Sequence, residues 1–214
     1  MPRLLLVEDH TLFRAGIRIL LERSAGGHTI VGEAGDGQAA ARLARELQPD
    51  IVLMDLTMPL MNGMESTRLI LRECPNTRVI VLSMHADPAF VAASLDAGAI
   101  GYALKDAAFA EIEAAIRAAL AGQKYLSPAV HKLRASGEPA DTGPAAPALK
   151  KLSPRERQIL QLIAEAFTSQ EIAASLELSV RTVETYRQRM MDKLDIHSAS
   201  ALTAFAIRHG ICSA

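Results

Sequence analysis

The first 121 residues alternate between short apolar runs and stretches of helical periodicity. The apolar runs predict strands near residues 3–7, 28–34, 51–55, 78–83 and 101–104. The periodic stretches predict helices near residues 12–24, 37–47, 63–74, 88–97 and 107–121. Because each predicted strand is followed by a helix, we expect an α/β domain whose parallel sheet carries helices on both faces.

After residue 152 the pattern is helical throughout. It predicts four helices, near residues 154–166, 169–176, 180–195 and 198–209. Ser153 and Glu156 have the spacing of a capping box, with Pro154 at the first helical position. Ser169 and Ser179 are expected to cap the next two helices.

The two patterns are separated by a stretch that belongs to neither. Residues 135–147 contain three prolines and no apolar stripe, so they bury too little surface to fold and favour an extended tether. We therefore predict a domain at residues 1–125, a linker at 126–148 and a second domain at 149–214.

Four apolar runs of the first domain end in polar residues with chemical potential. Glu8 and Asp9 follow the first run, and Asp55, Ser83 and Lys105 follow or close three others. Parallel strands bring their carboxyl ends to one edge of the sheet, where such folds place their sites. Three acids, a hydroxyl and a lysine at one edge suggest a divalent cation and a phosphoryl group.

These residues resemble the receiver domain of two-component response regulators. The resemblance rests on Glu8-Asp9, the run from Asp55 to Pro59, Asn62-Gly63, Ser83 and the run from Gly101 to Asp106. It implies a flavodoxin-like, doubly wound sheet of five parallel strands in the order 2-1-3-4-5.

The resemblance also implies a role for each residue of the site. Asp55 is the expected phosphoacceptor, with Lys105 and Ser83 binding the phosphoryl oxygens. Mg²⁺ is the expected cofactor, because a hard cation neutralises repulsion between a carboxylate and an anionic phosphorus centre. Its expected ligands are Glu8, Asp9, Asp55 and the backbone carbonyl of Thr57. Ser83 and Tyr102 form the expected switch, in which Ser83 moves toward the phosphoryl group and Tyr102 fills the vacated space.

The helical second domain resembles the LuxR-type helix-turn-helix, with the motif at residues 169–188. The family commonly has glycine at positions 166 and 177, and we expect Glu177, in the turn, to adopt a positive φ. The helix from Val180 is the expected recognition helix. The expected base-facing residues are Glu184, Thr185 and Gln188, with Glu184 accepting from cytosine N4. The expected phosphate contacts are Arg181, Tyr186, Arg187, Arg189 and Lys193.

Together the two resemblances imply a DNA-binding transcriptional regulator of the NarL/FixJ type rather than a turnover enzyme. Its expected partners are a sensor histidine kinase, promoter DNA, RNA polymerase and a second copy of the chain on DNA through residues 198–209. No apolar stretch approaches the roughly 20 residues of a membrane span, so no membrane partner is expected.

Composition and charge agree with this interpretation. Cys74 and Cys212 are the only cysteines, which fits a reducing cytoplasm. The six histidines show no zinc-binding spacing. Residues 1–131 carry 12 basic and 15 acidic side chains, whereas residues 150–214 carry 9 and 7, so the second domain is mildly basic.

Four alternatives remain open at this level. The acidic site would also suit a phosphatase or phosphotransferase, and LuxR-type modules also follow domains that bind small molecules. A receiver domain that acts in its unphosphorylated form is a further alternative. The four helices alone are compatible with a protein-interaction module.

Overall fold

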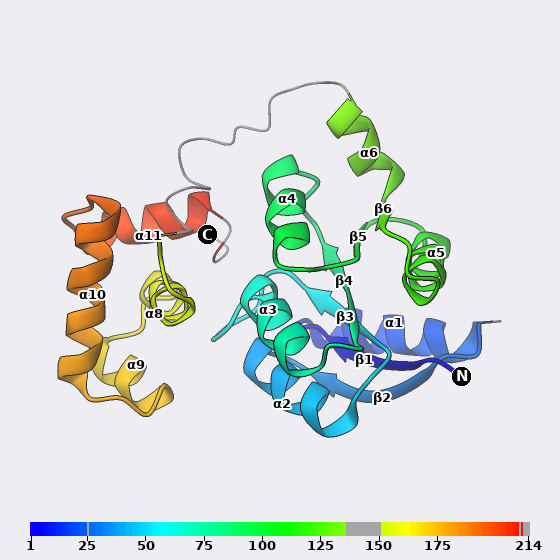
Figure 1. Cartoon of the computed structure of the whole chain (residues 1–214), viewed down its shortest axis with the longest axis horizontal. Coiled ribbons are helices and arrows are strands. Elements are labelled where there is room, and N and C mark those ends of the chain that lie inside the picture. Colours follow the sequence, from blue (N-terminus) through cyan, green and yellow to red (C-terminus); the bar gives the residue numbers. More distant parts are fainter. Residues whose placement is uncertain (25, 136–150, 210, 212–214) are drawn as a thin grey trace. The chain divides into compact units, whose positions relative to one another are not determined.

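The computed structural model describes residues 1–24, 26–135, 151–209 and 211. The chain divides into two compact units, Met1–Asp141 and Thr142–Ala214. Figure 1 colours both units along the sequence. No helix among the described residues is long and apolar enough to cross a membrane.

The first unit is built on a six-stranded parallel sheet. Its strands are β1 (Arg3–Val7), β2 (Thr29–Ala34), β3 (Ile51–Asp55), β4 (Arg78–Ser83), β5 (Gly101–Leu104) and β6 (Tyr125–Leu126), in the order β2-β1-β3-β4-β5-β6. The five predicted strands and their flavodoxin-like order are confirmed. The sixth strand was not predicted, since two residues carry no periodicity.

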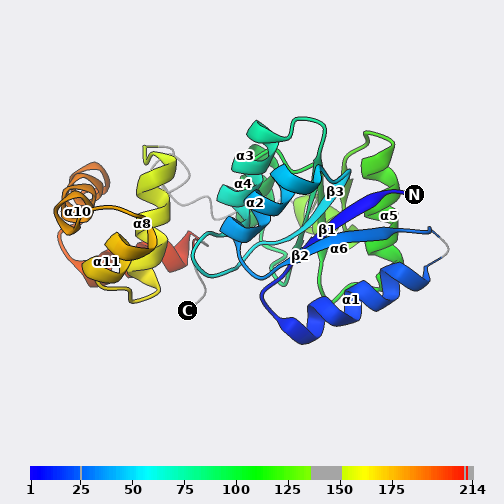
Figure 2. The same cartoon turned by 90° about the horizontal axis from the view of Figure 1, so that it is seen from below.

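Five helices cover the two faces of this sheet. They are α1 (Thr11–Arg23), α2 (Gly37–Leu47), α3 (Gly63–Glu73), α4 (Pro88–Asp96) and α5 (Phe109–Leu120). Helices α1 and α5 pack on one face, around a core that includes Ile17, Leu53 and Ile116. Helices α2, α3 and α4 lie on the other face, so the sheet is buried on both sides (Figure 2).

Residues 126–135, which the sequence analysis assigned to the linker, are structured. Tyr125 and Leu126 pair with β5 as β6, and helix α6 (Pro128–Ala135) follows. Val130 of α6 is fully buried in the same cluster as Tyr102. The Ser127 hydroxyl donates to Glu111 Oε2 at 2.7 Å and accepts from the Leu104 amide at 3.3 Å. The rest of the predicted linker, residues 136–148, lies outside the described residues.

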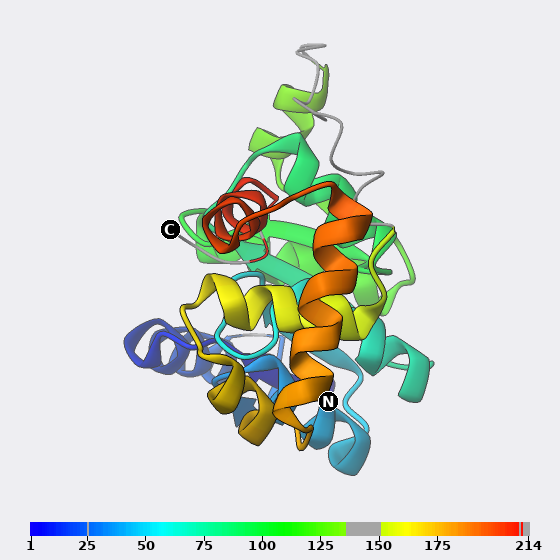
Figure 3. The same ribbon diagram turned by 90° about the vertical axis from the view of Figure 1, so that its left-hand side faces the viewer.

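The second unit is helical, as predicted. Its helices are α8 (Pro154–Ala164), α9 (Ser169–Ser175), α10 (Val180–Leu194) and α11 (Ala199–Arg208). Figure 3 shows α10 in orange, with α9 beside the end at which α10 begins. The core contains Ile159, Leu162, Val183, Met190 and Leu202, which are all fully buried.

The caps of this unit confirm two predictions and correct a third. Ser153 and Glu156 form the capping box of α8, and Ser179 accepts from the Thr182 amide at the start of α10. Helix α9 is capped by Thr168, which forms a capping box with Glu171, and not by Ser169 as predicted. Ser169 is already the first helical residue, so its hydroxyl is available for contacts with α10.

Two turns of the same unit place non-glycine residues in the left-handed region. Ala166 has a φ of 65° and Glu177 a φ of 54°. The positive φ expected for Glu177 is confirmed. The turn geometry is therefore kept at both positions at a modest cost in backbone strain.

Gly63 is required at the start of α3, close to the end of β3. A Cβ at position 63 would lie 2.1 Å from the Asp55 carbonyl oxygen, which is backbone and has little freedom to move. We predict that Gly63→Ala lowers the free energy of unfolding by about 1–3 kcal/mol, since the loop after Asp55 must shift.

Gly16 provides the matched control, because a Cβ there meets nothing within 4 Å on the exposed side of α1. Gly16→Ala is expected to stabilise the protein by about 0.5–1 kcal/mol. Urea unfolding measures both changes. Equal midpoints for the two variants would contradict the steric argument.

Candidate phosphoacceptor site and DNA interface

The carboxyl ends of the central strands bring the predicted acidic and basic residues together. Asp55 closes β3 and pairs in register with Leu82, while Ser83 at the end of β4 pairs with Leu104. The Lys105 amide donates to the Ser83 carbonyl oxygen at 2.9 Å, which extends the ladder by one residue. Strand pairing therefore places Asp55, Ser83 and Lys105 at one edge of the sheet.

Lys105 joins two buried carboxylates at this edge. Its ammonium lies 2.7 Å from Glu8 Oε2 and 2.9 Å from Asp55 Oδ2. The Glu8 and Asp55 side chains are only 3% and 4% exposed, and that of Lys105 is 8% exposed. The Lys105 ammonium also lies 5.2 Å from the centre of the Phe13 ring, a cation–π contact that helps to hold it in place.

Asp55 is the most strongly perturbed acid of the site. Burial and the neighbouring Glu8 carboxylate raise its pKa from 3.8 to about 6, although Lys105 favours the charged form. The Thr57 amide donates to Asp55 Oδ1 at 3.4 Å. One lysine therefore neutralises two acids incompletely, and the site favours a further positive charge.

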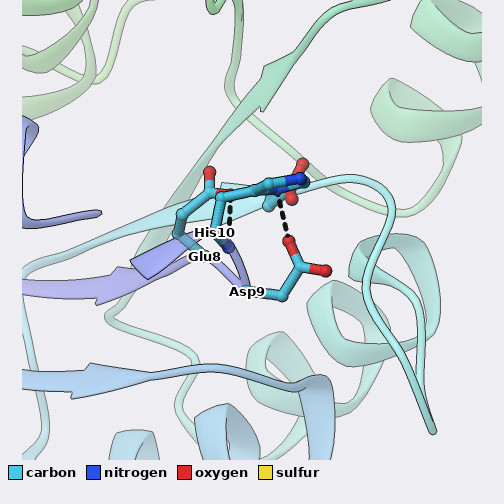
Figure 4. A group of neighbouring side chains, drawn as sticks. Glu8, Asp9 and His10 are labelled. Carbon is cyan, nitrogen blue, oxygen red and sulfur yellow. Dashed lines mark hydrogen bonds and ion pairs between the residues drawn. The ribbon is translucent and has the colours of Figure 1, made fainter. Parts of the chain in front are cut away.

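Asp9 and His10 complete the cluster, as Figure 4 shows. His10 Nδ1 lies 2.8 Å from Asp9 Oδ1 and 3.1 Å from Glu8 Oε1. Glu8, Asp9, His10 and Asp55 each offer a ligand atom, and these atoms all lie within 4.8 Å of one another. The three predicted acids are thus brought together as a pocket that could hold a metal ion.

His10 was not predicted as part of the site. Its position directly after Glu8-Asp9 was the only signal in the sequence. The carbonyl oxygen of Thr57 was predicted as a metal ligand, and the amide of the same residue donates to Asp55 Oδ1. The ligand role of that carbonyl stays a prediction.

Ser83 and Tyr102 meet through the backbone of His85. The Tyr102 hydroxyl donates to the His85 carbonyl oxygen at 2.7 Å, and the His85 amide donates to Ser83 Oγ at 3.1 Å. The His85 ring stacks on Phe90 of α4 with a centroid separation of 4.6 Å. Burial raises the pKa of Tyr102 to about 12. Tyr102 is fully buried, and its expected role in the switch stays a prediction.

The exposed face of α10 carries the predicted DNA contacts. Arg181, Thr185 and Arg189 follow one another at helical spacing and line a shallow hollow at the start of the helix, together with Ser179, Thr182 and Tyr186. The opposite face, with Val183 and Met190, is buried in the unit. The basic side chains on the exposed face are therefore available to an anionic partner.

Glu184 and Gln188 are engaged within the unit. The Ser169 hydroxyl donates to Glu184 Oε1 and accepts from Arg187 Nη1, the latter at 3.3 Å. Gln188 Nε2 donates to Asp192 Oδ1 at 2.8 Å. Ser169 thus links the side chains of Glu184 and Arg187 at the junction of α9 and α10, and these contacts were not predicted from the sequence.

Lys193 holds two helices together. Its ammonium lies 2.8 Å and 2.7 Å from the two carboxylate oxygens of Glu156, which belongs to the capping box of α8. The Glu156 side chain is 3% exposed, whereas that of Lys193 is 41% exposed. Despite desolvation, hydrogen bonds from Lys193 and Ser153 lower the pKa of Glu156. Lys193, predicted as a phosphate contact, is occupied by a buried acid in this structure.

Comparison with known proteins agrees with both halves of the chain. Residues 4–117 match the family model of the response regulator receiver domain, and residues 150–206 match that of the bacterial regulatory proteins of the LuxR family. The chain belongs to the NarL/FixJ-type response regulators.

Full-length relatives support this assignment. The regulator is 41% identical to the response regulator UvrY of Escherichia coli K12, over 100% of this chain and 97% of that protein. It is 40% identical to the response regulator GacA of Pseudomonas aeruginosa, over 100% and 99%. A solved complex of the response regulator RcsB with DNA matches with a TM-score of 0.58 at 29% identity, over 95% of this chain and 96% of that one.

The regulator is therefore a DNA-binding transcriptional protein of a two-component system and not a turnover enzyme. The receiver match also argues against a first domain that senses a small molecule.

The raised pKa of Asp55 predicts how stability depends on pH in metal-free protein. A folded-state pKa near 6 lies above the unfolded value of 3.8, so folding stability falls as pH rises from about 4 to about 6. Asp55→Asn removes this effect. We expect it to stabilise the protein by about 3 kcal/mol above pH 6 and by little near pH 4.

Urea unfolding between pH 4 and pH 7 in the presence of a chelator measures the difference. Asp106→Asn is the control, because this carboxyl is exposed and its replacement should give no gain that grows with pH. A constant difference between wild type and Asp55→Asn at all pH values would contradict the buried-charge argument.

Proposed function

We propose that the regulator is switched by phosphorylation of Asp55 by a sensor histidine kinase. The observation that carries the proposal is the position of Asp55, a buried carboxylate 2.9 Å from Lys105 within a cluster of acids. In the transfer, an Asp55 carboxylate oxygen bonds to phosphorus and the bond between phosphorus and the donor imidazole breaks. The electron pair leaves with the imidazole, which becomes neutral on taking up a proton.

The residues around Asp55 have matching roles. Lys105 binds a phosphoryl oxygen and offsets its charge, and Ser83 Oγ donates a hydrogen bond to another. When Ser83 turns toward the phosphoryl group, its contact with the His85 amide changes. The Tyr102 hydroxyl is hydrogen-bonded to the same His85 backbone, so the change also affects Tyr102. It reaches α4 because the His85 ring stacks on Phe90.

Mg²⁺ is the proposed cofactor, held by Glu8, Asp9, Asp55 and the Thr57 carbonyl. Hard oxygen donors dominate the cluster, which suits Mg²⁺. Glu8 Oε2 and Asp55 Oδ2 are buried, and one lysine ammonium, that of Lys105, lies 2.7 Å from the first and 2.9 Å from the second, so the two acids share a single positive charge. When bound, the ion neutralises the charge that opposes attack by a carboxylate on an anionic phosphoryl group.

The proposed output is promoter binding by a homodimer in the cytoplasm, with α11 joining two copies on DNA and RNA polymerase as the further partner. Helix α10 would enter the major groove, with Glu184, Thr185 and Gln188 reading bases. Arg181, Tyr186, Arg187 and Arg189 would contact phosphates, and Lys193 would do so only by releasing Glu156. The RcsB–DNA complex, a structural relative, supports this use of the fold.

Chemical phosphorylation tests the receiver half. Acetyl phosphate with Mg²⁺ is expected to label the wild type at one site per chain, and Asp55→Asn is expected to abolish labelling without unfolding the protein. Intact-mass spectrometry measures the added phosphoryl group. Asp106→Asn should keep full labelling. Stoichiometric labelling of Asp55→Asn would identify another nucleophile and overturn the assignment.

Salt dependence tests the DNA half. Arg189→Ala removes one counterion-releasing contact, so we expect weaker binding to every DNA sequence and a log–log salt slope reduced in magnitude by about 1. Fluorescence anisotropy over a range of salt concentrations measures the slope. Arg72→Ala, an exposed arginine of the receiver that is 72% accessible, removes the same charge and should leave the slope unchanged. The same slope for Arg189→Ala and wild type would exclude a phosphate contact.

A further inference from the structure

We propose that His10 makes the acidic cluster a site for first-row transition-metal ions, with its imidazole nitrogen as a ligand beside the carboxylates. The inference rests on the proposed metal-binding role of Glu8, Asp9 and Asp55. It adds a residue that changes which ions the site prefers.

The His10 side chain is oriented toward the acidic cluster. His10 is the N-cap residue of α1, yet its side chain does not cap the helix. It turns instead toward the acids, with Nδ1 2.8 Å from Asp9 Oδ1 and 3.1 Å from Glu8 Oε1 (Figure 4). A hydrogen on Nδ1 would lie between two carboxylate oxygens, which is where a metal ion binding the same three atoms would lie.

The spacing of the four ligand atoms is close to that of donors bound to one metal ion. Nitrogen and oxygen ligands of a transition metal lie about 2.1 Å from the ion, so two donors on one ion are at most about 4.2 Å apart. The ligand atoms of Glu8, Asp9, His10 and Asp55 lie within 4.8 Å of one another, so only a small contraction is needed. Asp9 Oδ1, which faces His10 Nδ1 at 2.8 Å, is buried without a hydrogen-bond partner of regular geometry among the described residues.

The chemistry of the donor set decides the ion class. Carboxylates alone suit Mg²⁺, whereas an added imidazole favours Mn²⁺ weakly and Co²⁺, Ni²⁺, Cu²⁺ and Zn²⁺ strongly. The His10 side chain is 74% exposed, so it can turn away at little cost when Mg²⁺ binds to oxygens alone. The site would thus take Mg²⁺ through its acids and a transition-metal ion through its acids and His10.

Calorimetric titration of the metal-free full chain with Ni²⁺ and with Mg²⁺ tests the proposal. The wild type is expected to bind Ni²⁺ at least about tenfold more tightly than Mg²⁺, and His10→Asn is expected to lose about tenfold or more of the Ni²⁺ affinity while Mg²⁺ affinity stays within about twofold. Saturating Mg²⁺ should weaken Ni²⁺ binding in the wild type, since both ions use the same acids.

His197→Asn is the matched control. His197 is also an exposed histidine beside a carboxylate, with Nε2 3.4 Å from Asp195 Oδ1, but it lies in the second unit. This variant should bind Ni²⁺ as the wild type does.

Three results would overturn the proposal: an unchanged Ni²⁺ affinity in His10→Asn, an equal loss of Mg²⁺ affinity, or Ni²⁺ binding that is insensitive to Mg²⁺. Labelling of His10→Asn by acetyl phosphate with Mg²⁺ is measured in parallel. If His10→Asn is still labelled while one of these three results is obtained, the His10 assignment fails and the Asp55 assignment stands.

Discussion

Two buried carboxylates that share one lysine are the constraint on which the receiver site depends. Removing charge from water is costly, and a buried ion pair recovers this cost only when the charges balance. Here Lys105 contacts both Glu8 and Asp55, so negative charge is left over. Burial, together with the Glu8 carboxylate, raises the pKa of Asp55, and the excess negative charge favours a cation. The sheet tolerates it because strand pairing fixes the backbone on both sides of the cluster.

The sequence was sufficient to predict this cluster because parallel strands align their carboxyl ends. Glu8, Asp55, Ser83 and Lys105 lie far apart in the chain, but each follows or closes an apolar run, and one topology brings them together. Two features left no such signal. Strand β6 has only two residues, and α6 buries Val130 from a segment that carries no clear apolar stripe. The role of His10 also depends on the direction of one side chain, which no spacing encodes.

In the helical unit too, the sequence pattern predicted the helices but not the side-chain contacts between them. Helical periodicity and capping signals predicted its four helices, and the expected positive φ of Glu177 follows from the geometry of the turn. The predicted N-cap of α9 was wrong by one residue. Thr168 and Ser169 are both good capping residues, and only the backbone conformation distinguishes them. Contacts of Ser169 with Glu184 and Arg187, and of Lys193 with Glu156, join residues 15 to 37 positions apart and have no periodic signature.

The Glu156–Lys193 pair has a consequence for how such proteins diversify. It ties α10, the proposed recognition helix, to the capping box of α8, and α10 packs on α8 and α9. The orientation of the exposed face of α10, which carries the proposed DNA contacts, is thus set by contacts inside the helical unit. A gene fusion that replaced the receiver with another sensory domain would transfer this surface with its shape intact. The Glu156–Lys193 pair is one of the internal contacts that would let the helical unit keep this shape beside a different partner domain.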